Sequence, residues 1–122
     1  MIGFLLAAVA AAAGVFIHGF VGSRIVVAPL LKAKDLTQPS RWLLFLCWHA
    51  VTVMLVALAA GFVWAALDPG AAVLGGMLAA LTGTLAALTL YVCLRAGFPP
   101  WRVPPFVLFT LMTAAAGWSA FA

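Results

Sequence analysis

Residues 42–67 read WLLFLCWHAVTVMLVALAAGFVWAAL and contain no Lys, Arg, Asp or Glu. A helix needs about 20 consecutive apolar residues to cross the hydrocarbon core of a bilayer, and this stretch exceeds that length. Because lipid offers no hydrogen-bond partners, the backbone of such a stretch must bond to itself, as it does in a helix. We therefore expect a membrane-spanning helix over residues 41–67, with Arg41 at one end and Asp68 beyond the other.

The rest of the chain has the same character. Hydrophobic residues make up 68% of the sequence and charged residues 7%, whereas soluble domains carry about 25% charged residues. Such a surface is suited to lipid rather than water. Further spans are expected over residues 2–22, 71–94 and 105–122. The sequence thus predicts an all-α fold, an integral membrane four-helix bundle with up-down-up-down topology that forms a single transmembrane domain over residues 1–122.

All basic residues lie in or beside two connections, one between the first two predicted spans and one between the last two. They are Arg24, Lys32, Lys34, Arg41, Arg95 and Arg102. The positive-inside rule assigns both connections to the cytoplasm, which places both termini on the non-cytoplasmic side. Anionic lipid headgroups are the partners expected for these side chains. Since the net charge of +4 resides in these connections, no nucleic-acid partner is predicted.

Two histidines, His18 and His49, lie inside the predicted spans. An ionisable side chain at membrane depth is costly and marks a functional site by default. The rise of a helix, about 1.5 Å per residue, puts both imidazoles in one layer near the cytoplasmic side. Thr89 and Tyr91 approach this layer from the third span, and Thr110 approaches it from the fourth. These five residues form the predicted ligand-binding site.

Four interpretations of the histidines remain open. Each ring can be neutral and hydrogen-bonded across the bundle, as packing alone would have it. Both can ligate a haem or a chlorophyll-type pigment. Both can hold a copper or zinc ion, although two histidines alone leave a zinc site incomplete. The fourth interpretation is a pocket for a quinone, a lipid or another apolar molecule with a polar head. The sequence does not name the cofactor or ligand.

Acidic residues are too scarce for most enzyme chemistry. The chain has no glutamate, and its two carboxylates are Asp35 and Asp68. These belong to opposite membrane faces, about 30 Å apart. Paired-carboxylate hydrolysis and two-metal catalysis are excluded on this distance. No Ser-His-Asp set and no phosphate-binding loop is visible. We assign no catalytic residues and favour a binding protein over an enzyme.

Small residues recur at a spacing of four in two spans. One stripe is Gly14, His18 and Gly22, and the other is Gly75, Ala79, Gly83 and Ala87. Small residues at this spacing let helix backbones approach closely. They serve either packing within the bundle or contact between copies of the chain in a homo-oligomer, and both interpretations are kept.

A pattern in the first half of the chain is formed by His18-Gly-Phe-Val-Gly22, then Pro29-Leu-Leu31, then Trp48-His49. It resembles that of small four-span bacterial inner-membrane proteins of unassigned function. In these, a His-x-x-x-Gly near the end of the first helix precedes a Trp-His in the second. Members often carry an acidic residue after the glycine, where this chain has Ser23. The resemblance implies a multi-pass protein of the bacterial inner membrane in which the two histidine segments pair.

Together these features predict a small inner-membrane binding or accessory protein with a polar site at His18 and His49. Such a protein would bind an apolar small molecule or cofactor there, or dock to a larger membrane complex. One alternative is a redox protein with a haem ligated by both histidines. Another is a small homo-oligomeric transporter or channel, because one copy has too few polar groups to form a conducting path.

Overall fold

The computed structural model describes all residues of the chain, 1–122, and every regular element in it is helical. The first helical run comprises α1 (Ile2–Phe16), the π-helical segment η1 (Ile17–Val27) and α2 (Ala28–Lys32). The second is α3 (Gln38–Leu67). A 3-10 turn, η2 (Pro69–Ala71), leads into α4 (Ala72–Ala96). Another, η3 (Pro100–Arg102), precedes α5 (Pro104–Phe121).

Four helical units are long and apolar enough to cross a membrane. They are Ile2–Lys32, Gln38–Leu67, Pro69–Ala96 and Pro104–Phe121. The chain thus has the build of a multi-pass membrane protein. The expected all-α class and the number of span-length helices are confirmed.

The first helical run continues past Gly22, where the sequence predicts its end, to Lys32. Within η1 the backbone is wider than an α-helix, and the N–H of Ala28 donates to the carbonyl of Ser23, five residues earlier. Pro29 falls in the first turn of α2, where its missing N–H costs little. Long π-helical stretches are rare, and π-helical turns occur often at functional sites.

The other helices begin and end within a few residues of the predicted bounds. α3 begins at Gln38, and the side chain of Thr37 caps it by accepting a hydrogen bond from the N–H of Ser40 at 3.4 Å. α4 ends at Ala96, where Gly97 adopts a left-handed conformation with φ 76°. Glycine adopts this conformation without strain and commonly ends helices in this way.

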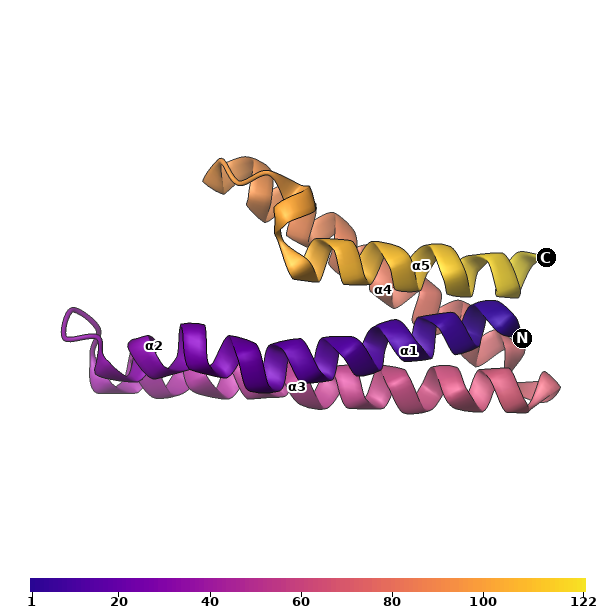
Figure 1. Cartoon of the computed structure of the whole chain (residues 1–122), viewed down its shortest axis with the longest axis horizontal. Coiled ribbons are helices and arrows are strands. Elements are labelled where there is room, and N and C mark those ends of the chain that lie inside the picture. Colours follow the sequence, from indigo (N-terminus) through magenta and orange to yellow (C-terminus); the bar gives the residue numbers. More distant parts are fainter.

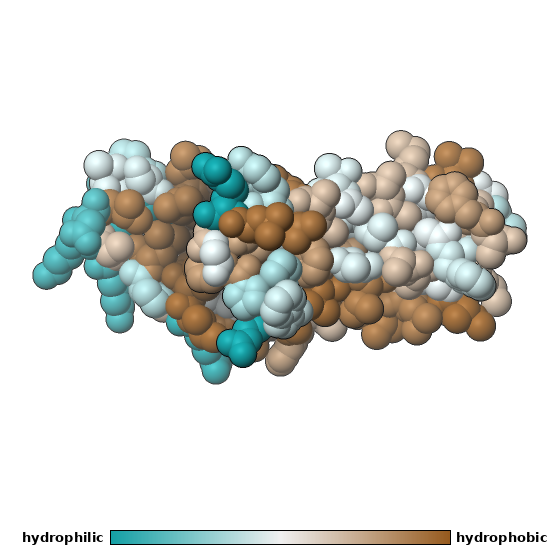
Figure 2. Space-filling model, turned by 90° about the horizontal axis from the view of Figure 1, so that it is seen from above, coloured by the Kyte–Doolittle hydropathy of each residue, from teal (hydrophilic) through white to brown (hydrophobic).

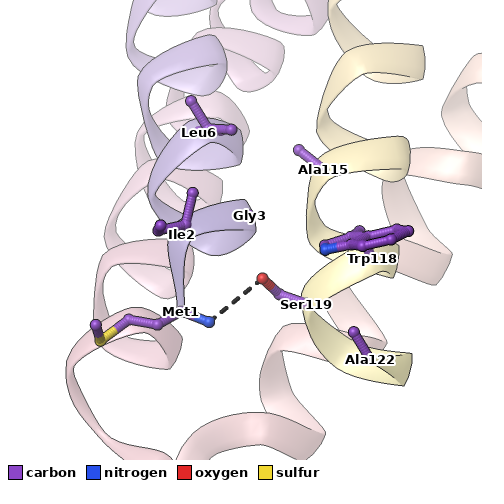
Figure 3. A pocket seen from close by; sticks show the side chains of 8 residues that line it. All are labelled: Met1, Ile2, Gly3, Leu6, Ala115, Trp118, Ser119 and Ala122. Atoms are coloured by element: carbon purple, nitrogen blue, oxygen red, sulfur yellow. Dashed lines mark hydrogen bonds between the residues drawn. The ribbon is translucent and has the colours of Figure 1, made fainter.

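Each helix packs against two neighbours, because α1 contacts α3 and α5, and α4 contacts α5 and α3. In Figure 1 both chain ends and the α3–α4 connection lie at one end of the molecule, whereas the connections that follow α2 and α4 lie toward the other. The N-terminal ammonium of Met1 donates to the hydroxyl of Ser119 at 3.3 Å, which joins α1 to α5 (Figure 3). We call the end that holds Met1 the terminal end, and the end that holds residues 33–37 the loop end.

The buried core lies toward the terminal end. Its largest fully buried side chains are Phe62, Leu58, Met112 and Thr82. Around them, the ring of Phe4 and alanines of α1, α3, α4 and α5 fill the space between the helices. The core cluster contains no residue of η1 or α2. Figure 1 shows the end of α4 and the start of α5 diverging from α1 and α3 toward the loop end. The two helix pairs are therefore held together at one end and separate toward the other.

The small-residue stripe in α4 serves packing within the bundle over most of its length. Gly75 and Ala79 are buried, and a Cβ atom at Gly75 would lie 2.5 Å from the ring of Phe4. A Cβ atom at Gly83 would lie 3.2 Å from a side chain of α5. Ala87 is exposed. Contacts inside the chain thus account for the first three members, and a contact between copies stays a prediction.

One hydroxyl pair joins α4 to α5. The hydroxyl of Thr113 shares its proton between Thr82, at 2.9 Å, and the carbonyl of Phe109 in its own helix, at 2.8 Å, and Thr82 in turn donates to the carbonyl of Ala79. Thr113→Val keeps the shape and removes both contacts of this hydroxyl, so we expect the free energy of unfolding in bicelles to fall by about 0.6 kcal/mol for the interhelical one. Thr110→Val is the matched control, because Thr110 is exposed and its hydroxyl donates only to the carbonyl of Phe106 in its own helix. An equal loss in both variants would contradict the interhelical role.

Candidate functional site

A groove of about 690 Å³ is lined by residues of η1, α3 and α5, together with Gly14 of α1 and Leu85 of α4. Toward the loop end, Figure 1 shows the end of α4 and the start of α5 diverging from α1 and α3. Nearly all the lining side chains are apolar. His18 and Trp48 are the only two that carry a nitrogen or oxygen atom. The groove is therefore an apolar space with two nitrogen-bearing rings on its wall.

His18 lies at the start of η1 and contacts α3. Its Nδ1 atom is 3.0 Å from the hydroxyl oxygen of Thr52. Its ring stacks on the indole of Trp48, with ring centroids 3.9 Å apart and planes inclined by 15°. Trp48 and Thr52 are four residues apart on α3 and so lie one above the other on one face of that helix. Two residues on the same side of α3 thus hold the imidazole, Thr52 by a hydrogen bond at its edge and Trp48 by stacking on its plane.

One glycine of η1 allows this contact. A Cβ atom at Gly22 would lie 2.6 Å from Cζ2 of Trp48, whereas one at Gly19 would make an ordinary contact of 3.5 Å with Cγ2 of Thr52. Glycine is the residue that permits such close approach to a backbone. A side chain at position 22 would push the indole away from His18. The His-x-x-x-Gly spacing is thus the sequence signal for a large side chain, here Trp48, packed against the histidine.

His49 lies near His18 but does not line the groove. His18 stacks on Trp48, the residue that precedes His49 on α3. His49 packs instead on the edge of Phe45, with ring centroids 4.3 Å apart and planes at 66°. It follows Trp48 in sequence and so points about 100° away from it around α3. The two histidine segments thus lie side by side, but only the ring of His18 lines the groove.

The three other predicted site residues lie away from the groove. Thr89 donates to the carbonyl of Leu85, and Thr110 donates to the carbonyl of Phe106, each at 2.7 Å within its own helix. Tyr91 is 61% exposed. None of them hydrogen-bonds either histidine. Helix rotation is not readable from the sequence when every face is apolar, so the layer of these residues could be inferred but not their direction.

Thr52 and Trp48 are the site residues that the predicted set lacks. Their spacing of four residues on one predicted helix is the signal that could have found them. Trp48 also carries an unusual feature, since its Nε1 atom is buried and has no hydrogen-bond partner. The hydroxyl of Ser23, the residue after Gly22, is likewise buried and unpaired. Unpaired buried polar groups cost about 1–3 kcal/mol each, so the unpaired indole that stacks on His18 points to a function rather than to packing alone.

Basic side chains gather toward the loop end, as the strongly hydrophilic groups in the left half of Figure 2 show. Arg24, Lys32, Lys34, Arg95 and Arg102 are exposed, and Arg41 is half-buried. The Nη1 group of Arg41 donates to the carbonyl of Ala33 at 3.1 Å, which holds the connection against the start of α3. The groove thus lies in the half of the molecule that carries the positive charge.

A second hollow, of about 610 Å³, lies at the terminal end between α1 and α5 (Figure 3). The ammonium of Met1 and the hydroxyl of Ser119 bond each other there, and the indole of Trp118, which also lines the hollow, is 77% exposed. No group of three or more His, Cys, Asp and Glu residues lies together in a way that could hold a metal ion. Of the two hollows, only the groove at His18 is lined by a residue with a buried, unpaired polar atom, Trp48.

Comparisons with models of protein families, with curated proteins and with solved structures find no match to this chain. The chemistry of the site itself is therefore the basis on which a function can be assigned.

Proposed function

We propose that this protein is a small multi-pass protein of the bacterial inner membrane that binds an apolar small molecule from the lipid phase in the groove at His18. One observation carries the proposal, namely an apolar groove of about 690 Å³ whose wall holds an imidazole fixed by Thr52 and Trp48. Ligand sites in proteins typically measure about 300–1,000 Å³ and combine an apolar lining with a few polar groups. The absence of a catalytic residue set favours binding over catalysis.

The proposal includes an orientation. We place the loop end in the cytoplasm and both termini outside, with the helices alternating in direction. The gathering of basic side chains toward the loop end supports this, because cytoplasmic connections carry an excess of Lys and Arg. The groove would then lie near the cytoplasmic leaflet. The resemblance of the His-x-x-x-Gly and Trp-His segments to bacterial inner-membrane proteins supports the choice of membrane.

Trp48 gives a direct readout of groove occupancy. With Trp42, Trp64, Trp101 and Trp118 replaced by phenylalanine, it is the only tryptophan left, and none of the replaced residues lines the groove. This variant is placed in lipid nanodiscs and titrated with decyl-ubiquinone, an apolar quinone, at known mole fraction in the lipid. We expect quenching of Trp48 fluorescence that saturates. Quenching that rises without saturation, as it does for a tryptophan octyl ester in the same lipid, would contradict the proposal.

A substitution that narrows the groove should weaken this binding. Val51 lines the groove, whereas Val53 on the same helix is 69% exposed and does not. We expect Val51→Phe to raise the Kd of decyl-ubiquinone about threefold to tenfold, because overfilling a packed space typically costs about 1 kcal/mol or more. Val53→Phe adds the same ring on the lipid side and should leave the Kd unchanged. Equal effects in the two variants would place the ligand elsewhere.

A further inference from the structure

Thr52 bonds differently from other threonines in the helices. Thr84, Thr89 and Thr110 donate their hydroxyl protons to carbonyl groups four residues earlier. Thr52 makes no such bond, and its only partner is Nδ1 of His18 at 3.0 Å. A hydroxyl proton left without an acceptor in apolar surroundings costs about 1–3 kcal/mol. The Thr52 hydroxyl therefore donates, and Nδ1 of His18 accepts.

This bond fixes where the imidazole carries its proton. A neutral imidazole has one N–H and one free lone pair, so a ring that accepts at Nδ1 carries its proton at Nε2. An imidazolium ring, protonated on both nitrogens, would also carry a proton at Nε2. The chain offers Nε2 no acceptor, the atom is not buried, and His18 is one of the side chains that line the groove. His18 thus has an accessible N–H donor.

We propose that the occupant of the groove presents a carbonyl oxygen, as quinones and esters do, to the Nε2–H of His18. This inference rests on the proposed function and names its ligand class. The indole of Trp48 stacks on this ring, but its Nε1 atom is buried and is not open to the occupant. No lining side chain offers an oxygen that would satisfy the Nε2–H of His18 from within the groove.

The same arrangement argues against ligation of a metal ion or haem iron by this ring. A ligating imidazole nitrogen needs a free lone pair. In His18 the lone pair of Nδ1 accepts from Thr52, and Nε2 carries the proton. A ligand with a hydrogen-bond acceptor can therefore bond the Nε2–H of this ring without any change in it. A metal ion at Nδ1 could bind only if the hydrogen bond from Thr52 were broken.

The first test needs no ligand. The full chain is labelled with nitrogen-15 in its histidines and placed in nanodiscs, and a two-bond proton–nitrogen correlation spectrum is recorded, with His49→Phe to assign the signals. We expect the pattern of a ring that carries its proton at Nε2. Thr52→Val should shift the ring toward the tautomer protonated at Nδ1, and Thr52→Ser should restore the original pattern. A ring protonated only at Nδ1 in the unsubstituted chain would overturn the inference and leave the proposed groove binding intact.

The second test compares three probes in the same nanodiscs: decyl-ubiquinone, methyl dodecanoate and dodecylbenzene. The first two carry a quinone and an ester carbonyl, and the third carries none. We expect a downfield shift of the Nε2–H proton with a carbonyl probe and none with dodecylbenzene. Thr52→Val should raise the Kd of that carbonyl probe about twofold to tenfold, the loss of one neutral hydrogen bond, and leave dodecylbenzene unaffected.

Each outcome of the second test is informative. A response to one carbonyl probe only identifies the quinone or the ester as the source of the oxygen. Equal binding of all three probes overturns the carbonyl inference while the proposed binding stands. Binding of none of the three overturns the proposed function together with the inference.

Discussion

Replacement of Phe62 by alanine is expected to lower the free energy of unfolding by about 3–5 kcal/mol, the cost of removing a fully buried aromatic side chain. Phe62 is 0% exposed and belongs to the cluster that joins α1, α3, α4 and α5 at the terminal end. Lipid tails cannot replace its contacts there, because the neighbouring side chains close the space on all sides. The loss can be measured by steric trapping in bicelles.

Val63 provides the control for this experiment. It follows Phe62 on α3 but is 40% exposed, so lipid tails can occupy the space that Val63→Ala leaves. We expect this variant to change the free energy of unfolding by no more than about 0.5 kcal/mol. Comparable losses at both positions would mean that the packed core does not lie where the structure places it.

The second large effect is expected at Gly22. Gly22→Ala places a Cβ atom 2.6 Å from Cζ2 of Trp48, so the indole must move off the imidazole of His18. Overpacking of this kind costs about 1–3 kcal/mol, and we expect that loss in the free energy of unfolding. The near-ultraviolet circular dichroism of the single-tryptophan chain should change, because the stacking partner of Trp48 is lost. Quenching by decyl-ubiquinone should weaken in parallel.

Gly117 is the matched control, since a Cβ atom there would meet nothing within 4 Å. Both substitutions exchange glycine for alanine inside a helix, where alanine is favoured by up to about 1 kcal/mol. Gly117→Ala should therefore leave stability unchanged or slightly raised, with the spectrum of Trp48 unaltered. If Gly22→Ala behaved in the same way, the close contact between η1 and Trp48 would be refuted.

The fold is largely readable from the sequence because a bilayer imposes one strong constraint. Apolar runs such as residues 42–67 must be helical, and their number follows from counting them. The exact course of the first helix is not readable in this way. Its continuation from Gly22 to Lys32 depends on a π-helical register and on Pro29 falling in a first turn, and apolar periodicity signals neither.

The sequence predicts the depth of the site residues in the membrane but not the direction in which their side chains point. Helical rise places His18 and His49 in one layer, and the structure puts the two histidine segments side by side. Which ring faces the groove depends on rotation about the axis of α3, and a helix that is apolar on every face gives no clue to it. Thr52 could have been found only by asking which hydroxyl lies one turn from Trp48. The separation of the helix pairs toward the loop end leaves no signature in the sequence, since it reflects where packing is missing.

The groove lies between helices that lipid surrounds, and this sets how its occupancy is governed. The ligand that we propose would reach it sideways from the bilayer, so the relevant concentration would be its mole fraction among lipids rather than its amount in water. Each methylene group adds about 0.8 kcal/mol to partitioning into an apolar phase. A longer tail therefore raises occupancy without a single additional contact with the chain. The length of the alkyl chain would thus set how much ligand enters the membrane, and the hydrogen bond from His18 would select among ligands by their polar group.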